Sequence, residues 1–153
     1  MDFRIEKKDS FQIMGLSGHE TVDTPRPEGE LTGVWAGFFP EYNDKLNDYY
    51  TEPFWQIGAI EYEFVDGKKK IIIGAEYKGK LPEGMSLETI PAATWAVFSF
   101  DYPCGYYHYI EKYNRIVTEW LPTSGYKRDE SVRQLEVYYK HWEIWIPVLK
   151  EKI

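Results

Sequence analysis

Apolar and polar side chains alternate along residues 131–149, as they do in half-buried β-strands. The first predicted strand has an apolar face with Leu135, Val137 and Tyr139. Its opposite face is mixed and carries Glu136 and Tyr138. The second predicted strand has an apolar face of Trp142, Ile144, Ile146 and Val148, and an opposite face with Glu143 and Trp145. The alternation therefore predicts a two-faced β-hairpin.

The register of this hairpin depends on its turn. A two-residue turn at Lys140-His141 pairs Tyr139 with Trp142. Lys-His is not a favoured turn dipeptide, so a longer connecting loop is the alternative. Because paired residues lie on the same side of a sheet, this register places Glu136 opposite Trp145 and Tyr138 opposite Glu143. We expect a patch of two carboxylates and two large rings.

Two interpretations of the patch are open. It is either the polar, solvated face of a half-buried sheet or the wall of a ligand pocket. Large exposed rings such as Tyr138 and Trp145 usually mark interaction sites, which favours the pocket. Rings suit flat apolar ligands, and carboxylates suit a positive charge.

The rest of the chain divides into two similar halves. Apolar patterns predict strands over 2–8, 11–22, 54–64 and 70–77, and a helix over 31–50 that Pro40 kinks or divides. Gly15 and Gly18 suggest a bulge or bend in the second of these strands. In the second half, two strand pieces within 86–103 precede a helix over 104–122 and the final hairpin. Each half then has the order β, α, β, β.

This order predicts an α+β fold and a single domain over 1–153. We expect duplicated βαββ repeats, roughly 1–80 and 81–153, with one long helix per repeat covering one side of antiparallel sheets. The other side of the sheets would form a central ligand pocket between the repeats.

The amino-acid composition and net charge favour some classes of function and exclude others. Aromatic residues make up 18% of the chain, more than a core of this size needs, which favours a ring-lined site over a merely aromatic core. The net charge of −7 argues against nucleic-acid binding and weakly favours cationic or neutral ligands. The single cysteine, Cys104, excludes an internal disulfide and fits a cytoplasmic location. We expect no signal peptide, membrane span, metal site or cofactor, because no segment has the required pattern.

Further candidate lining residues come from other elements. Trp95 lies in a strand, and Tyr107 lies with Tyr106 and Tyr109 near the start of the second helix. Trp35 in the first helix follows core spacing, so we assign it to the core in preference to the pocket.

Five second-half segments resemble the GyrI-like family, also called the AraC-type effector-binding domain. They are 82–85 (PEGM), 90–98 (IPAATWAVF), 120–126 (WLPTSGY), 135–138 (LEVY) and 143–148 (EIWIPV). The resemblance implies a duplicated βαββ fold around a central pocket, in which a carboxylate and stacked rings hold lipophilic cations. It places the acidic position of one motif on Glu136, and the acidic and aromatic positions of the closing strand on Glu143 and Trp145.

Two departures from the family's regulators matter: we expect no DNA-binding region before the domain, and the resemblance is weakest in the first half, so the identity of the ligand is not carried over. We therefore expect a stand-alone protein that senses or sequesters lipophilic, cationic or planar aromatic compounds. One alternative is a hydrolase of cyclopropane-containing natural products with Glu136 as the base. The other is a protein-interaction module of the gyrase-inhibitor type.

Overall fold

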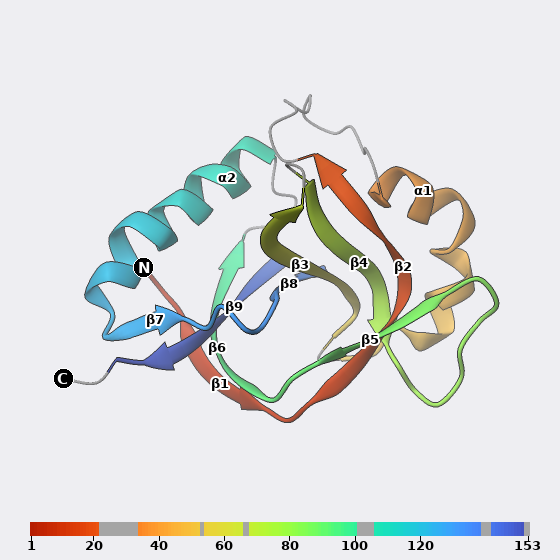
Figure 1. The fold of residues 1–153 in the computed structure, drawn as a ribbon, viewed down its shortest axis with the longest axis horizontal. Helices are drawn as coiled ribbons and strands as arrows, with labels where there is room; N and C mark the ends of the chain where they lie inside the picture. Colours follow the sequence, from red (N-terminus) through yellow and green to blue (C-terminus); the bar gives the residue numbers. More distant parts are fainter. Residues whose placement is uncertain (22–33, 53, 66–67, 101–105, 139–141, 152–153) are drawn as a thin grey trace.

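The computed structural model describes residues 1–21, 34–52, 54–65, 68–100, 106–138 and 142–151 (Figure 1). The elements are β1 (Arg4–Lys8), β2 (Phe11–Thr21), α1 (Val34–Glu41), the 3-10 helix η1 (Asp44–Tyr49), β3 (Gln56–Val65), β4 (Lys68–Glu76), β5 (Ser86–Ile90), β6 (Ala93–Phe100), α2 (Tyr106–Arg115), the π-helix η2 (Ile116–Trp120), the 3-10 helix η3 (Leu121–Thr123), β7 (Tyr126–Arg128), β8 (Gln134–Tyr138) and β9 (Trp142–Lys150). The strands predicted from alternation are confirmed, and β7 is an additional short strand. The fold class is α+β, with an antiparallel sheet and a few helices.

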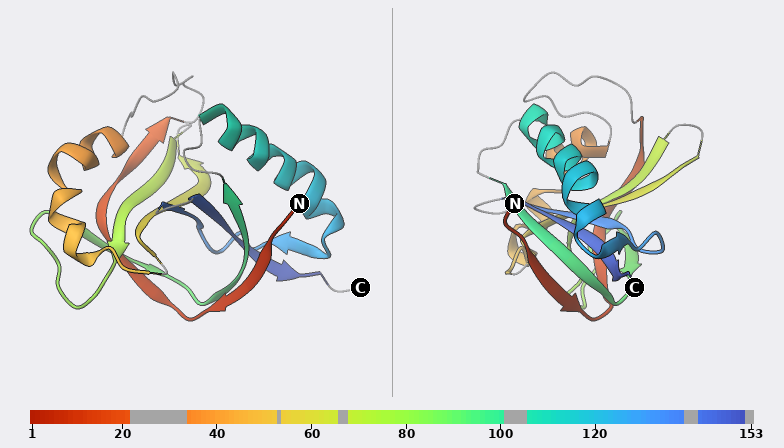
Figure 2. Two further views of the ribbon diagram at one scale, coloured as in Figure 1. Left: turned by 180° about the vertical axis from the view of Figure 1, so that it is seen from behind. Right: turned by 90° about the vertical axis from the view of Figure 1, so that its left-hand side faces the viewer.

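The nine strands of the described residues form one sheet in the order β1-β6-β9-β8-β3-β4-β2-β5, with β7 beside β9. Only Asp9 and Ser10 separate β1 from β2, and only Pro91 and Ala92 separate β5 from β6. The two bent segments pair with each other twice, as β1 with β6 and as β2 with β5. The sheet therefore curls strongly, as Figure 2 shows from two further sides.

The glycines of β2 do not produce the predicted bulge. β2 and β4 pair without interruption from Ile13 to Thr21. Gly15 pairs with Gly74, and a Cβ on Gly15 would lie 1.9 Å from the Ile73 carbonyl oxygen. A Cβ on Gly18 would lie 2.6 Å from Val34 Cγ2. These glycines permit close approach of backbones and of α1, which explains them without a bulge.

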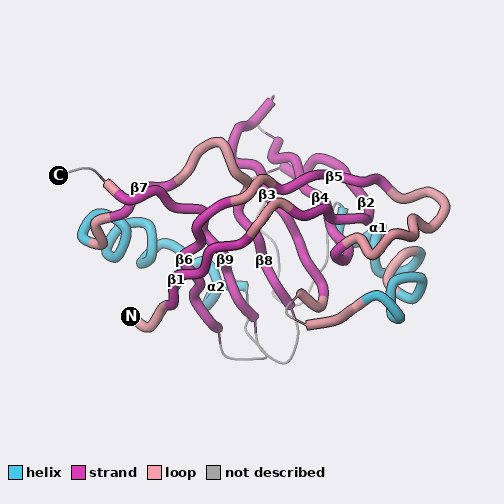
Figure 3. The backbone as a smooth tube through the Cα atoms, turned by 90° about the horizontal axis from the view of Figure 1, so that it is seen from below, coloured by secondary structure: helices cyan, strands magenta, loops and turns pink. Residues whose placement is uncertain are grey.

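Both α-helices cover the same face of the sheet (Figures 1 and 3). α1 packs on β2, β3 and β4 through a cluster that includes Phe38 and Ile73. α2 and η2 pack on β6 and β9 through a cluster that includes Phe98 and Ile116. β8 lies between these two clusters in the strand order.

The opposite face of the sheet is packed with side chains, which corrects the prediction of a cleft there. Its buried residues include Phe54, which precedes β3, and Trp95, Leu135, Val137 and Trp145 on β6, β8 and β9. Because the sheet curls around this face, its apolar side chains meet one another and need no helix to cover them.

The first predicted helix is interrupted near Pro40, as expected. α1 includes Pro40 and ends at Glu41, and η1 follows from Asp44. Proline lacks the backbone donor that a continuous helix needs, so the chain changes to the tighter 3-10 form. In the second half, α2 continues into the π-helix η2.

The register of the β8–β9 hairpin differs from the prediction by one residue. Tyr138 pairs with Trp142 and Glu136 with Ile144, so three residues, 139–141, connect the strands. These connecting residues, with the predicted turn, lie outside the described part of the chain. A one-residue shift exchanges the faces of one strand relative to the other. The expected four-residue patch is therefore divided between the two faces of the sheet.

Candidate functional site

Glu136 lies on β8, in the middle of the sheet, on the face that α1 and α2 cover. Its backbone pairs with Gly58 on one side and Ile144 on the other. The side chain is 7% exposed. Its two carboxylate oxygens accept hydrogen bonds from the hydroxyls of Tyr109, on α2, and of Tyr138, on the same strand. Glu136 is thus held between a helix and the sheet.

Aromatic rings surround this carboxylate on the side of α1. The Tyr138 ring meets the Trp35 ring edge to face, with centroids 5.3 Å apart, and the Trp142 ring in the same way at 5.1 Å. Trp35, on α1, reaches this position because Gly58, on β3 beneath it, has no side chain. A Cβ on Gly58 would lie 3.3 Å from Trp35 Cζ2.

A second aromatic group lies on the side of α2. The Tyr109 ring stacks on the Phe100 ring, with centroids 5.3 Å apart, and on the Tyr113 ring at 6.2 Å. The carboxylate is therefore enclosed by faces and edges of rings from α1, β8, β9, β6 and α2. Such rings attract a cation through their quadrupoles.

No cationic side chain of the described residues pairs with Glu136, whose bonds are the two from tyrosine hydroxyls. Withdrawing a carboxylate from water is unfavourable unless a charge of opposite sign compensates it. The arrangement can therefore accept a positive charge from outside the chain.

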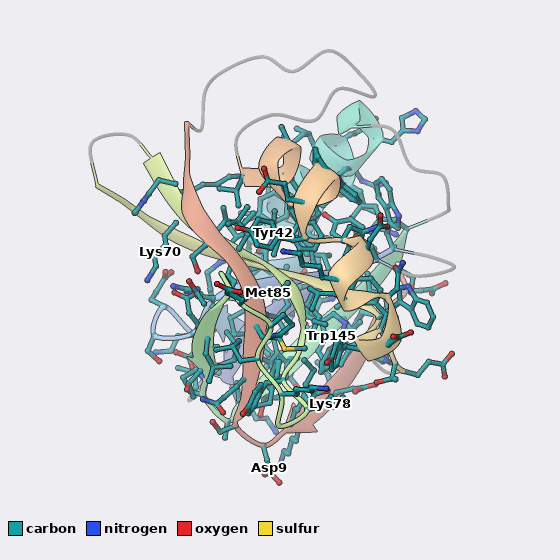
Figure 4. All side chains as sticks on the ribbon, turned by 90° about the vertical axis from the view of Figure 1, so that its right-hand side faces the viewer. Asp9, Tyr42, Lys70, Lys78, Met85 and Trp145 are labelled. Atoms are coloured by element: carbon teal, nitrogen blue, oxygen red, sulfur yellow. The ribbon has the colours of Figure 1, made fainter. Side chains whose placement is uncertain are left out.

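Glu143, the other predicted carboxylate, lies on the opposite face and already has a cationic partner. Arg4 donates from Nη1 to Oε2 at 2.6 Å and from Nη2 to Oε1 at 3.2 Å, and the Trp145 indole N–H donates to Oε1 at 3.2 Å. Hydrogen bonds to Glu143 raise the pKa of Arg4 above its usual value, although burial acts against this. The Arg4 guanidinium also lies over the Trp145 ring, 5.6 Å from its centroid. Figure 4 shows Trp145 within the packed interior.

The remaining predicted site residues are separate from Glu136. Trp95 is fully buried on the same face as Trp145, with ring centroids 6.1 Å apart. Its indole Nε1 has no hydrogen-bond partner within the described residues. Tyr107 lies in the first turn of α2, but its side chain is outside the described part of the structure.

The structure brings Tyr138, among the predicted residues, together with Glu136, and it adds others. Tyr109 contacts Glu136, and Trp35, Phe100 and Trp142 line its surroundings. Core spacing correctly assigned Trp35 to the core, where it is buried, but gave no sign that its ring lies near Glu136. The register error placed Trp142 on the wrong face relative to Glu136. Tyr109 was visible as one of three tyrosines at the start of the helix.

A third charged cluster lies at one end of the inner face. Glu88 accepts from Arg133 at 2.6 Å and lies 3.0 Å from the Lys70 ammonium, which is at the outer end of β4 in Figure 4. Burial alone would raise the pKa of Glu88, but the hydrogen bonds and charges of Arg133 and Lys70 outweigh it and lower the pKa. Beside it is an open cavity of about 320 Å³, lined by Glu88, Thr89, Ile90, Pro91, Ser131 and Arg133. This cavity is not part of the Glu136 site.

The described residues also bear on two other features, a metal centre and a membrane span. They contain no group of three or more His, Cys, Asp or Glu side chains placed to hold a metal ion. None of their helices is long and apolar enough to cross a membrane.

Comparison with known proteins identifies a family and a common fold. The family model Cass2, described as integron-associated effector binding protein, matches residues 4–148. No curated protein matches the chain. The GyrI-like resemblance of the sequence is confirmed by this family match together with the solved structures that share the fold.

Three solved structures illustrate that fold. An integron cassette protein of Vibrio cholerae is 18% identical with a TM-score of 0.68, over 96% of this chain and 95% of that one. The protein SAV2435, solved with tetraphenylphosphonium, is 16% identical with a TM-score of 0.68, over 97% and 94%. The C-terminal domain of EcmrR is 15% identical with a TM-score of 0.66, over 98% of each chain.

Proposed function

This chain belongs to the Cass2 family of integron-associated effector binding proteins, and we propose that it binds a lipophilic cation against Glu136, between α1 and α2. The observation that carries the proposal is a carboxylate that is 7% exposed, has no cationic partner among the described residues and is surrounded by rings. The related structure that holds tetraphenylphosphonium supports the same class of ligand.

The physical basis is charge compensation in an apolar surrounding. A bound cation offsets the unfavourable desolvation of Glu136, and each ring face adds a cation–π attraction of roughly 0.5–2 kcal/mol. Rings of Trp35, Tyr138 and Tyr109 make few directional demands, so we expect broad specificity.

We also propose that the two halves of the chain arose by duplication. Exchanging β1 with β5, β2 with β6, β3 with β8 and β4 with β9 turns the strand order into its own reverse. This symmetry would place the β3–β8 pair, and with it Glu136, at the junction of the repeats.

Titration of tryptophan fluorescence tests the binding proposal. The probes are tetraphenylphosphonium and the neutral triphenylphosphine oxide, and the proteins are wild type, Glu136→Gln and the matched variant Glu143→Gln. We expect micromolar binding of the cation to wild type, at least about tenfold weaker binding to Glu136→Gln, and a change within about twofold for Glu143→Gln.

Equal affinity of wild type and Glu136→Gln for the cation would contradict the proposed role of Glu136. The neutral oxide should bind weakly and show no dependence on Glu136, because it brings no charge to compensate. Mass spectrometry of a recovered cyclopropane-containing compound would separate holding from hydrolysis: a binder returns it unchanged.

A further inference from the structure

A hydrogen-bonded group of three neutral side chains lies next to Glu136. The Tyr50 hydroxyl donates to Asn43 Oδ1 at 2.8 Å, and Gln56 Nε2 donates to Asn43 Oδ1 at 3.1 Å and to the Tyr50 hydroxyl at 3.3 Å. Asn43 precedes η1, Tyr50 follows it, and Gln56 begins β3. Tyr50 and Gln56 are both buried.

The position of Gln56 ties this group to the carboxylate. Gln56 pairs with Tyr138 across β3 and β8, and Gly58 pairs with Glu136. Gln56 and Glu136 are therefore diagonal neighbours on the same face of the sheet, and such neighbours lie within about 7–8 Å of each other. The Trp35 ring occupies the space over Gly58, and it also contacts the Tyr138 ring.

The internal bonds of the group leave one donor and one acceptor unused. Asn43 uses its carbonyl and Gln56 its amino group, so the Asn43 amino group and the Gln56 carbonyl have no partner in the described structure. Exchanging O and N of both amides would reverse the roles and again leave one of each. Neither atom is fully enclosed, since the enclosed polar atoms without partners in the described residues are on Ser17 and Trp95. Both atoms therefore retain some access from solvent.

The group carries no charge at ordinary pH. Burial raises the pKa of the Tyr50 hydroxyl to about 12; the nearby Asp44 carboxylate adds to the effect, and the hydrogen bond from Gln56 opposes it. Tyr50 therefore stays protonated and continues to donate. An unused donor and an unused acceptor in one neutral group complement a carboxamide, which has one of each.

We infer that Asn43, Tyr50 and Gln56 form a subsite that selects lipophilic cations carrying a carboxamide. The inference rests on the proposed function, because the subsite adjoins the carboxylate that would hold the cation. Glu136 and the rings supply attraction for any lipophilic cation, and the subsite distinguishes one cation from another. A ligand without a polar group would leave the subsite to water.

A matched pair of probes tests the inference. Tetraphenylphosphonium and (4-carbamoylphenyl)triphenylphosphonium differ only by one carboxamide. Their Kd values are measured by calorimetry on wild type, Gln56→Met and Tyr50→Phe, with Gln12→Met on β2 as the control for the same substitution elsewhere. Circular dichroism verifies that each variant is folded.

We expect wild type and Gln12→Met to bind the carbamoyl compound about tenfold more tightly than the parent, a difference of about 1.4 kcal/mol. In Gln56→Met this preference should disappear while affinity for tetraphenylphosphonium stays within about twofold. Tyr50→Phe should reduce the ratio of the two Kd values by about half, because it removes the hydroxyl that orients both amides.

Other outcomes are distinguishable. If neither compound binds wild type, the proposed function fails. If both bind wild type equally, the function stands and the subsite is overturned, whatever the variants do. If Gln56→Met is folded and loses affinity for both compounds equally, Gln56 supports the site without selecting ligands, which also overturns the subsite.

Discussion

Glu136 and Glu143 lie on adjacent strands of one hairpin, are 7% and 8% exposed, and face opposite sides of the sheet. Glu143 accepts two hydrogen bonds from Arg4, whereas Glu136 accepts only neutral hydroxyl donors among the described residues. The two carboxylates are therefore equally buried, but within the described residues only the charge of Glu143 is compensated by a cation. Burial of a carboxylate does not identify a ligand site until its partners are known, because the same residue can complete a structural ion pair.

The surroundings of the two carboxylates differ as well. Glu143 belongs to the inner face, where Trp145, Phe54 and Trp95 pack against one another across the curled sheet. Glu136 belongs to the outer face, where the sheet meets two separate helices. Packed helices can slide by small amounts, which would give the proposed ligand a way to reach the outer face.

The largest expected effect is on the inner face. Trp145→Ala removes a ring that is 1% exposed and should lower the free energy of unfolding by about 3–5 kcal/mol. Trp142→Ala, on the same strand but half-buried on the outer face, should cost less and should weaken binding of tetraphenylphosphonium. Urea denaturation of both variants measures the stabilities, and equal losses would remove the distinction between the faces.

The next effect concerns the ion pair. Arg4→Met leaves Glu143 buried without a cation and should lower the free energy of unfolding by about 2 kcal/mol, less than for a fully buried pair because the Arg4 side chain is 45% exposed. The control is Arg115→Met, which breaks the exposed Arg115–Glu119 pair and should cost below about 0.5 kcal/mol. Similar urea midpoints for the two variants would show that the Arg4 pair contributes no more than a surface pair.

The smallest expected effect is on stability at Glu136. Glu136→Gln removes an uncompensated charge and keeps an amide oxygen for a tyrosine hydroxyl, so the free energy of unfolding should change by less than about 1 kcal/mol. The same denaturation experiment measures it. A loss as large as that of Arg4→Met would indicate that Glu136 is a structural residue like Glu143.

Much of the fold could be predicted from the sequence, because local patterns determine local structure. Alternation located β8 and β9, and Pro40 indicated where the first helix is interrupted. Both strands were predicted correctly, but their pairing register was wrong, because the register depends on whether the turn has two or three residues. That single residue decides whether Glu136 shares a face with Trp145 or with Trp142.

The candidate site was predictable only in part for the same reason. The burial of Glu136 between clusters follows from the position of β8 in the sheet, which is a long-range property of the strand order. Trp35 is at core spacing in its helix, and only Gly58 on a distant strand explains why its ring lies beside Tyr138. The partner of Glu143 comes from the other end of the chain, at Arg4.

The pairing of β1 with β6 and of β5 with β2 has a consequence for how the chain folds. Arg4 pairs with Val97 and Phe11 with Ile90, so β1 and one edge of β2 have partners that are synthesised only with the second half. Neither half forms all of its strand pairs alone, because the first strand of each half, β1 or β5, pairs with a strand of the other half. Contacts of such high sequence separation favour slow folding. The nascent first half therefore exposes the edges of β1 and β2 until the second half leaves the ribosome, a period in which these edges are open to pairing with another chain.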